Sequence, residues 1–310
     1  MKILVTGAAG FIGYHLCKRL EQEGHEIIGV DNLNEYYDVN LKHERLKRLN
    51  ITFHKLDLCD DLSDVFDQGI DCVVNLAAQA GVRYSIENPY AYELSNGQGF
   101  LNLLEHMRRY NVKRLVFASS SSVYGGNTKI PFSVKDTVDH PVSLYAATKK
   151  YNELQAHVYY KLYGIKSIGL RFFTVYGPWG RPDMAYYSFT KNIVEGKTIK
   201  LFNHGDHFRD FTYIDDIVEG ILLSIMNIRG YNILNLGKGD TDTLGDFVSI
   251  LEKHLNKKAV TELLPMQPGD VHGTYADITE TKELLGWQPR TNLDEGLKHF
   301  VDWYNDYFSM

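Results

Sequence analysis

The sequence contains little cysteine and no recognisable arrangement of metal-binding side chains. Its 310 residues include three cysteines, Cys17, Cys59 and Cys72, which are odd in number and share no close spacing. Such cysteines fit neither a disulfide framework nor a zinc site, and they indicate a reducing compartment. The twelve histidines form no HxxxH or HExxH pair, so we expect no bound metal.

The sequence also lacks long apolar runs and an excess of basic residues. No stretch reaches the length of a membrane span, and the net charge of −6 provides no basic footprint for nucleic acid. We therefore expect neither a membrane nor a nucleic acid as a partner. The opening residues, MKILVTG, already have the pattern of a strand, so we expect no signal peptide and a cytoplasmic location.

A strand–turn–helix–strand pattern opens the chain, in MKILVTGAAGFIGYHLCKRLEQEGHEIIGVD. Gly7, Gly10 and Gly13 lie between the first strand and the helix, in a GxxGxxG variant of the dinucleotide-binding fingerprint. Glycines there permit a tight turn and bring a pyrophosphate to the helix N-terminus. Asp31 ends the second strand, where an acid binds ribose hydroxyls and repels a 2′-phosphate, so the pattern favours NAD over NADP. The alternative for Asp31 is an ordinary loop carboxylate.

Further apolar strands follow, with amphipathic helices between several of them. We predict these strands at residues 51–55, 72–76, 114–119 and 167–172. The alternation predicts an α/β protein with a doubly wound parallel sheet, the Rossmann arrangement. Beyond residue 172 the alternation loosens, so we expect 1–172 to bind the dinucleotide and 173–310 mainly to form a smaller, mixed α/β substrate domain. A strand near 231–237 is expected to return to the main sheet.

Ligands of such sheets bind beyond the carboxyl ends of the strands. Three further segments fall there: KLDL, NLAAQAGVR and ASSSSVYG. The small residues Ala77 and Ala78 would let a cofactor pass close to the backbone, although tight packing explains either one equally well. The residues expected to contact NAD are Gly7, Gly10, Phe11, Ile12, Gly13, Asp31, Asn32, Asp57, Leu58, Leu76, Ala77, Ala78, Tyr145 and Lys149.

Tyr145 and Lys149 stand four residues apart in SLYAATKK, in the middle of a predicted helix. This spacing puts them on one helix face. A nearby ammonium lowers the pKa of a phenol, which makes Tyr145 a candidate general base. Taken alone, the pair is equally compatible with a solvated helix face that has no chemical role.

Together these segments resemble the extended short-chain dehydrogenase/reductase family, which includes NAD-dependent epimerases and dehydratases. The resemblance rests on TGAAGFIG, NLAAQAGV, SSSSVYG and YAATK, and it covers essentially the whole chain. Within that family the sequence resembles the UDP-glucuronate 4-epimerases, on the evidence of DNLNEYYDVNLKHERL, TVYGPWGRPDMA, RDFTYIDDIVEG and LPMQPGDV.

The resemblance implies a catalytic set of three side chains. Tyr145 is the implied base, Lys149 anchors the nicotinamide ribose and lowers the tyrosine pKa, and Ser120 is the catalytic hydroxyl. Arg181 and Thr174 are expected to hold the sugar carboxylate. The other residues expected to contact the UDP-sugar are Arg209 at the diphosphate, Asp270 at the uridine ribose or beside Arg209, and Gln79, Ser121 and Ser122.

The implied reaction is epimerisation at C4 of UDP-glucuronate to UDP-galacturonate, through transient oxidation by tightly bound NAD and a 4-keto intermediate. The alternatives are a 4-epimerase of neutral UDP-hexoses, a UDP-glucuronate decarboxylase and an NAD-binding sensor without catalysis. Related dehydratases and decarboxylases carry carboxylates just after the catalytic hydroxyl, where this sequence has Ser121 and Ser122. The resemblance further implies a homodimer, paired through a four-helix bundle built from residues 96–109 and 145–163.

Overall fold

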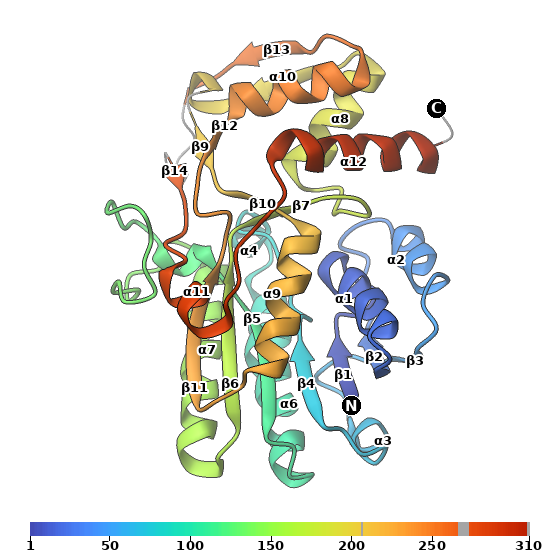
Figure 1. The fold of residues 1–310 in the computed structure, drawn as a ribbon, viewed down its shortest axis with the longest axis vertical. Helices are drawn as coiled ribbons and strands as arrows, with labels where there is room; N and C mark the ends of the chain where they lie inside the picture. The colour runs from blue at the N-terminus through green and yellow to red at the C-terminus, as the bar shows by residue number, and fades with distance from the viewer. Residues whose placement is uncertain (206, 266–272, 309–310) are drawn as a thin grey trace.

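A parallel sheet forms the centre of the protein. The computed structural model describes residues 1–205, 207–265 and 273–308. Within these residues, seven parallel strands pair in the order β11-β6-β5-β4-β1-β2-β3 (Figure 1). Their bounds are β1 Lys2–Thr6, β2 Glu26–Asp31, β3 Thr52–Lys55, β4 Cys72–Asn75, β5 Arg114–Ser120, β6 Lys166–Phe172 and β11 Tyr231–Leu236.

The predicted doubly wound fold is confirmed by this strand order. The chain builds outward from β1 in one direction through β2 and β3, and in the other through β4, β5 and β6. The predicted return strand is also confirmed, because β11 pairs in parallel with β6 along its whole length. The strand order therefore reverses beside β1, where the loops after β1 and β4 separate and leave room for a ligand.

Alternate strand residues bury apolar side chains on both faces of the sheet. Ile3 and Val5 of β1 belong to the core that includes α1 (Phe11–Gln22) and α9 (Ile214–Met226). Leu4 belongs to the opposite core, with α3 (Ser63–Phe66), α6 (Gly99–Arg109) and α7 (Leu144–Tyr163). Burial on both faces explains why these strands are almost continuously apolar in the sequence.

Helix α7 begins at Leu144, directly before the tyrosine of the SLYAATKK segment. Ser143 is its N-cap, and the Ser143 hydroxyl oxygen accepts a hydrogen bond from the backbone N–H of Ala146 at 3.1 Å. Tyr145 consequently lies in the first turn of the helix, and the expectation that it lies mid-helix was wrong. Gly164 ends the helix in the left-handed conformation, at φ 67°.

A smaller, mixed α/β part lies over the carboxyl edge of the main sheet (Figure 1). Its position is consistent with a substrate domain, and the boundary at residue 172 stays a prediction. Its helices are α8 (Ala185–Glu195), α10 (Leu244–Leu255) and α12 (Leu293–Tyr307). Its strands form the pairs β7 (Thr174–Tyr176) with β10 (Phe211–Tyr213) and β8 (Thr198–Leu201) with β13 (Val260–Leu263), and the set β12 (Asp242–Thr243), β9 (Phe208–Arg209) and β14 (Gly273–Thr274).

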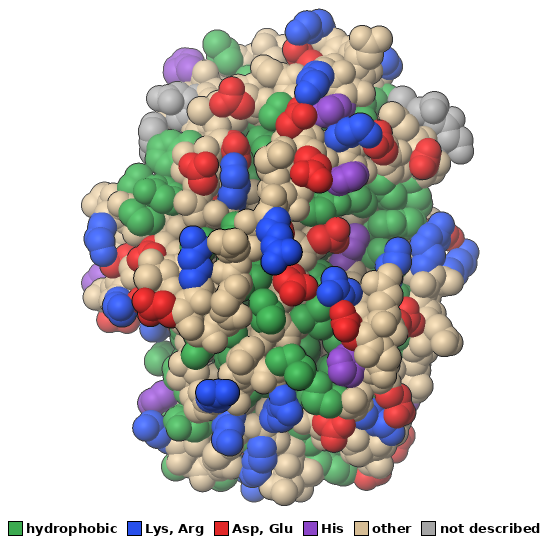
Figure 2. All heavy atoms as spheres, viewed as in Figure 1, with side chains coloured by type: hydrophobic (Ala, Val, Ile, Leu, Met, Phe, Trp, Pro, Cys, Tyr) green, Lys and Arg blue, Asp and Glu red, His purple; other side chains and the backbone are tan. Residues whose placement is uncertain are grey.

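The remaining elements are short connections between these layers. They are α2 (Val39–Leu46), α4 (Tyr84–Glu87), α5 (Pro89–Tyr92), the π-helix η1 (Glu93–Gln98), the 3₁₀ turns η2 (Ser121–Tyr124) and η3 (Phe202–Gly205), and α11 (Thr279–Leu285). In the part of the chain that the structure describes, none of the helices has the length and apolar character needed to cross a bilayer. Basic and acidic side chains are interspersed over the face shown in Figure 2.

Candidate active site

A cleft of about 800 Å³ opens at the carboxyl ends of the main-sheet strands. Loops after β1 to β6 line it, together with the segment that leads into α8. Parallel strands bring their carboxyl ends to one edge, so residues far apart in the sequence meet there. The predicted residues that line the cleft are Gly7, Gly10, Phe11, Ile12, Gly13, Asp31, Asn32, Asp57, Leu58, Leu76, Ala77, Ala78, Gln79, Ser120, Ser121, Ser122, Tyr145, Lys149, Thr174 and Arg181.

The glycine turn leaves a helix N-terminus open to the cleft. Gly7 has a φ of 72°, and its N–H donates to the carbonyl of Val30 at 2.7 Å. A Cβ at Gly13 would lie 2.0 Å from the carbonyl oxygen of Gly7, so the turn cannot accept a larger residue there. Gly10 caps α1 without a side-chain hydrogen bond. The first N–H groups of α1 therefore suit the pyrophosphate of a dinucleotide.

Asp31 lies at the end of β2, in position for a ribose. Its carboxylate accepts hydrogen bonds from the backbone N–H groups of Leu33 at 2.8 Å and Ala9 at 3.1 Å. Burial raises the pKa of Asp31, while these two hydrogen bonds and nearby cations oppose the rise. Asn32 and Asp57 are hydrogen-bonded to each other at 2.7 Å beside it. This group of acceptors fits the adenosine ribose of NAD.

Lys149 is fixed at the base of the cleft. Its Nζ donates to the carbonyl of Ala118, on β5, at 2.9 Å, and burial lowers the pKa of Lys149 to about 8. The ammonium is 5.9 Å from the centre of the Tyr145 ring. Helical spacing therefore brings the two side chains near each other, while the lysine points to the strand.

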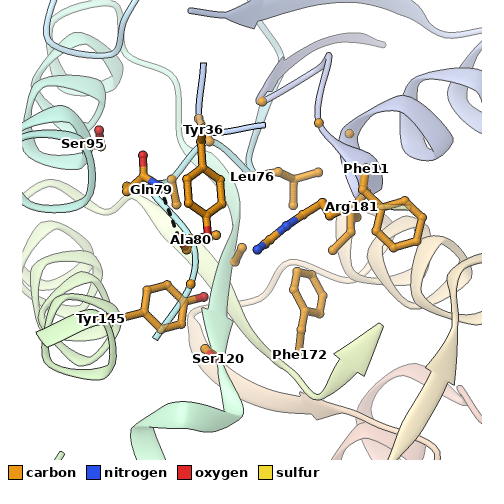
Figure 3. A pocket seen from close by; sticks show the side chains of 18 of the residues that line it. Phe11, Tyr36, Leu76, Gln79, Ala80, Ser95, Ser120, Tyr145, Phe172 and Arg181 are labelled. Atoms are coloured by element: carbon orange, nitrogen blue, oxygen red, sulfur yellow. Dashed lines mark hydrogen bonds between the residues drawn. The ribbon is translucent and has the colours of Figure 1, made fainter. Parts of the chain in front are cut away.

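Tyr145 faces Ser120 and Arg181 across the cleft (Figure 3). Burial raises the pKa of Tyr145, whereas a hydrogen bond with Ser120 and the charge of Arg181 lower it. The cation that lowers this pKa in the structure is Arg181, and the expectation that Lys149 lowers it stays a prediction. Tyr145 and Ser120 together form a donor–acceptor pair suited to proton transfer.

Arg181 is already paired with a carboxylate of this chain. Its Nε donates to Asp183 Oδ1 at 3.0 Å, and its Nη2 donates to Asp183 Oδ2. The hydroxyl of Tyr36 donates to the same Oδ2 at 3.3 Å. Sequence reasoning missed Tyr36 and Asp183, although Tyr36 follows the carboxyl end of β2 and Asp183 is two residues from Arg181.

A buried ion pair lies beneath the catalytic residues. Glu153 of α7 accepts two hydrogen bonds from Arg171 of β6, at 2.8 and 2.9 Å, and the two side chains are 2% and 3% exposed. The hydroxyl of Ser119 donates to Glu153 at 2.7 Å. The Arg171 guanidinium also lies 4.9 Å from the centre of the Tyr124 ring. These contacts fix α7 against the ends of β5 and β6.

Asn96 joins the loop after β4 to the catalytic helix. It lies on the π-helix η1, a distortion that is frequent at functional sites. Its Oδ1 accepts from the N–H of Gln79 at 2.8 Å, and its Nδ2 donates to the carbonyl of Gln79 and to Thr148 Oγ1, both at 3.0 Å. Sequence periodicity gave no signal for this buried amide.

Arg45 connects the glycine turn with the segment that carries Arg181. Its Nη1 donates to the carbonyl of Ala9 at 2.9 Å, and its Nη2 donates to the carbonyls of Trp179 at 2.5 Å and Gly180 at 3.3 Å. Arg45 is fully buried. The dinucleotide-binding and substrate-binding sides of the cleft are therefore joined through one side chain.

Of the predicted substrate residues, Arg209 is not among the described residues that line this cleft. Arg209 lies on β9, where its Nη1 donates to the carbonyl of Phe208 at 2.9 Å. Asp270 lies outside the described residues. Their expected contacts with the UDP part of the substrate stay predictions.

Fold and site define a dinucleotide-binding α/β protein with a tyrosine–serine pair at the sheet edge. Residues 3–237 match the model of the NAD dependent epimerase/dehydratase family. UDP-glucuronate 4-epimerase 4 of Arabidopsis thaliana is 49% identical over 331 residues, which cover 99% of this chain and 76% of that protein. The chain belongs to the NAD-dependent epimerase/dehydratase family.

Solved structures resemble this one over nearly its whole length. The crystal structure of UDP-glucuronic acid 4-epimerase from Bacillus cereus, in complex with UDP-glucuronic acid and NAD, has a TM-score of 0.93 and 36% identity, and covers 99% of this chain and 100% of that chain. The UDP-glucose 4-epimerase of Thermotoga maritima, solved with UDP-glucose, has a TM-score of 0.91 and 33% identity at the same coverage.

Loss of Glu153 should destabilise the protein strongly. Glu153→Ala leaves Arg171 buried without its carboxylate, and removal of one partner of a buried ion pair costs about 3–5 kcal/mol. Glu153→Gln keeps the shape and part of the hydrogen bonding, so its loss should be smaller. Thermal unfolding measures both. The exposed pair Lys298–Asp302 is the control, because Lys298→Ala should change stability by less than about 1 kcal/mol. Equal, small effects at both pairs would contradict the structural role of Glu153.

Proposed function

We propose that this protein epimerises UDP-glucuronate to UDP-galacturonate at C4, with NAD bound at the glycine turn. The observation that carries the proposal is the position of Arg181, whose guanidinium reaches into the cleft opposite Tyr145 and Ser120 (Figure 3). A fixed cation there suits a carboxylate next to the reacting carbon. The similarity to UDP-glucuronate 4-epimerases over the whole chain supports the same activity.

Each catalytic side chain has a distinct task in this reaction. Tyr145, which faces Ser120 in the cleft, removes the proton of the sugar 4-hydroxyl and returns a proton after the sugar has turned its other face. Lys149 is held by Ala118 close to the tyrosine, where it positions a ribose hydroxyl. Bound NAD supplies the hydride acceptor at C4 and the donor for the return step, so the net reaction consumes no oxidant.

The site has to orient the sugar carboxylate as well as bind it, because the 4-keto intermediate is a β-keto acid. Such acids lose CO₂ readily when the breaking C–C bond overlaps the carbonyl π-system. Arg181 and Thr174 both line the cleft. A bidentate arginine fixes the position as well as the plane of a carboxylate, so the pair keeps the C5–C6 bond near the carbonyl plane, where this overlap does not occur. Arg181 and Thr174 thus both bind the charged sugar and prevent its decarboxylation.

Two rival activities differ from this one in what they require of the cleft. Related decarboxylases carry a carboxylate just after the catalytic hydroxyl, whereas Ser121 and Ser122 occupy those positions in the cleft wall. A 4-epimerase of neutral UDP-hexoses needs no cation facing the sugar. The similarity to a UDP-glucose 4-epimerase keeps this second activity open to test.

Parallel assays with UDP-glucuronate and UDP-glucose test the proposal. The NAD-loaded protein is incubated with each substrate, and the products are followed by NMR. We expect UDP-galacturonate from the uronate and much slower turnover of the neutral sugar. Turnover of UDP-glucose alone would replace the proposed function by the neutral epimerase, and pentose as the main product would replace it by decarboxylation.

We also place this activity in the cytoplasm. Cys17, Cys59 and Cys72 are all free thiols, and Cys17 and Cys72 are buried. Free cysteines of this kind suit a reducing compartment.

An apolar stripe on α7 supports the proposed homodimer. Tyr151, Leu154, Val158 and Leu162 recur on one face of α7 and are exposed, and Leu101 of α6 is exposed as well. Singly exposed apolar residues are ordinary, whereas a row on adjoining helices is typical of an interface. We propose that a second copy of the chain covers this row, so that α6 and α7 of both copies form a four-helix bundle.

Light scattering should give twice the mass of one chain at micromolar concentration. Leu154→Glu places a charge in the centre of the row and should shift the protein towards monomers. Met226→Glu is the matched control, because Met226 is also exposed but ends α9. A monomeric wild-type protein, or equal dissociation by both substitutions, would contradict the proposed interface.

Tyr145→Phe should reduce turnover by about 10²- to 10⁴-fold, the usual contribution of a general acid–base group. The ring and its packing against Tyr92 are kept, so bound NAD should be retained. The measurement is the epimerisation rate together with the NAD content of the purified variant. Tyr160→Phe, farther along the same helix, should leave the rate unchanged. A Tyr145→Phe rate within threefold of wild type would exclude Tyr145 as the base.

Arg181→Ala should have two separable effects. It should weaken UDP-glucuronate binding by on the order of 1.5–3 kcal/mol, because a charge-assisted bidentate pair is lost. It should also raise the share of pentose product, because the freed carboxylate rotates out of the carbonyl plane. Arg181→Lys should be intermediate, since an ammonium attracts without orienting. Product partitioning by NMR measures this, and an equal loss with both sugars and no decarboxylation would assign Arg181 a purely structural role.

A further inference from the structure

Asp183 occupies the side of Arg181 that we assign to the sugar carboxylate. Nε and Nη2 of Arg181 form a fork, and both of its hydrogen bonds go to the carboxylate of Asp183. The two side chains are 22% and 31% exposed, and both line the cleft. The pair is therefore covered by protein yet within reach of a ligand that enters the cleft.

This contact places two carboxylates in competition for one guanidinium. A uronate that uses the fork of Arg181 has to displace Asp183 from it, and like charges so close together repel each other. A neutral sugar leaves the ion pair between Arg181 and Asp183 intact. Asp183 is therefore expected to lower the affinity for the charged sugar. With a neutral sugar in the cleft, Asp183 still neutralises Arg181, so the cation is not left unpaired.

Tyr36 provides a second partner for Asp183. Its hydroxyl donates to Asp183 Oδ2 at 3.3 Å, and the Arg181 guanidinium lies 5.9 Å from the centre of its ring. Burial, together with the charge of Asp183, raises the pKa of Tyr36 to about 12, so the hydroxyl remains a donor at neutral pH. When Asp183 leaves Arg181, it keeps this hydrogen bond and is not left without a partner in the cleft.

We propose that Asp183 is an internal competitor for the sugar carboxylate, and that the exchange of Arg181 between Asp183 and the substrate sets the discrimination between charged and neutral UDP-sugars. Tyr36 shares Asp183 with Arg181 before the exchange and becomes its main partner afterwards. This inference rests on the proposed uronate epimerase function and names the residues that adjust its specificity.

The exchange predicts that substitutions of Asp183 and Tyr36, the two partners of one hydrogen bond, have opposite effects on UDP-glucuronate binding. Asp183→Asn removes the competing charge, so UDP-glucuronate should bind about tenfold more tightly, on the scale of one charge-assisted hydrogen bond. The ratio of UDP-glucuronate to UDP-glucose affinity should rise with it. Tyr36→Phe removes the alternative partner, which leaves Asp183 more firmly on Arg181, so UDP-glucuronate should bind several-fold more weakly while UDP-glucose is unchanged.

Titration calorimetry on the NAD-loaded protein tests this, with UDP-glucuronate, UDP-glucose and UDP as ligands. UDP lacks the sugar, so its affinity should be the same in all variants. Glu35→Gln is the matched control, because Glu35 is an exposed acid beside Tyr36, and loss of its charge should leave the affinity ratio unchanged. The NAD content and melting temperature of each variant establish that it is folded.

Several results would overturn the inference. One is weaker UDP-glucuronate binding by Asp183→Asn, because Asp183 would then brace Arg181 in its binding orientation. Others are an unchanged affinity ratio, the same ratio change in Glu35→Gln, and weaker binding by both Asp183→Asn and Tyr36→Phe. Failure of the proposed function gives a different pattern, since wild-type protein would then form no UDP-galacturonate from UDP-glucuronate, whatever residue stands at position 183.

Discussion

The ion pair between Glu153 and Arg171 is the interaction on which the catalytic geometry depends. It joins α7, which carries Tyr145 and Lys149, to β6, and the Ser119 hydroxyl extends the contact to β5 one residue before Ser120. An ion pair this deeply buried requires good geometry, because desolvation is costly and only a close, directed contact offsets it. That directionality fixes the rotation and height of the helix, which apolar packing alone specifies less strictly.

Much of the fold follows from patterns visible in the sequence. Apolar strands, the glycine turn and Asp31 predict a parallel sheet, and such a sheet gathers its carboxyl-end loops at one edge. This is why residues as distant as Gly7, Ser120 and Arg181 were correctly expected in one cleft. The apolar residues of a helix or strand repeat with a short period in the sequence, and few rules govern how such elements are connected in a sheet.

Polar contacts between distant elements leave no such pattern. Asn96, Arg45 and the pair Glu153–Arg171 each satisfy hydrogen bonds that exist only after folding, so their spacing in the sequence carries no signal. The pairing of Arg181 with Asp183 was missed although they are two residues apart, because their segment is neither helix nor strand and has no repeat that predicts a contact. The relation between Tyr145 and Lys149 shows a related limit: helical spacing establishes that two side chains are neighbours, whereas the direction of each depends on what else it contacts.

The bridge made by Arg45 restricts how this architecture can be recombined. A chimera that joins the first half of this chain to the second half of a relative exchanges the carbonyls at Trp179 and Gly180 while keeping the arginine that binds them. Arg45 is fully buried, so a relative with a differently shaped segment would enclose a guanidinium whose Nη2 has lost its acceptors. Segments 31–46 and 177–184 should therefore come from the same parent protein when a chimera is built.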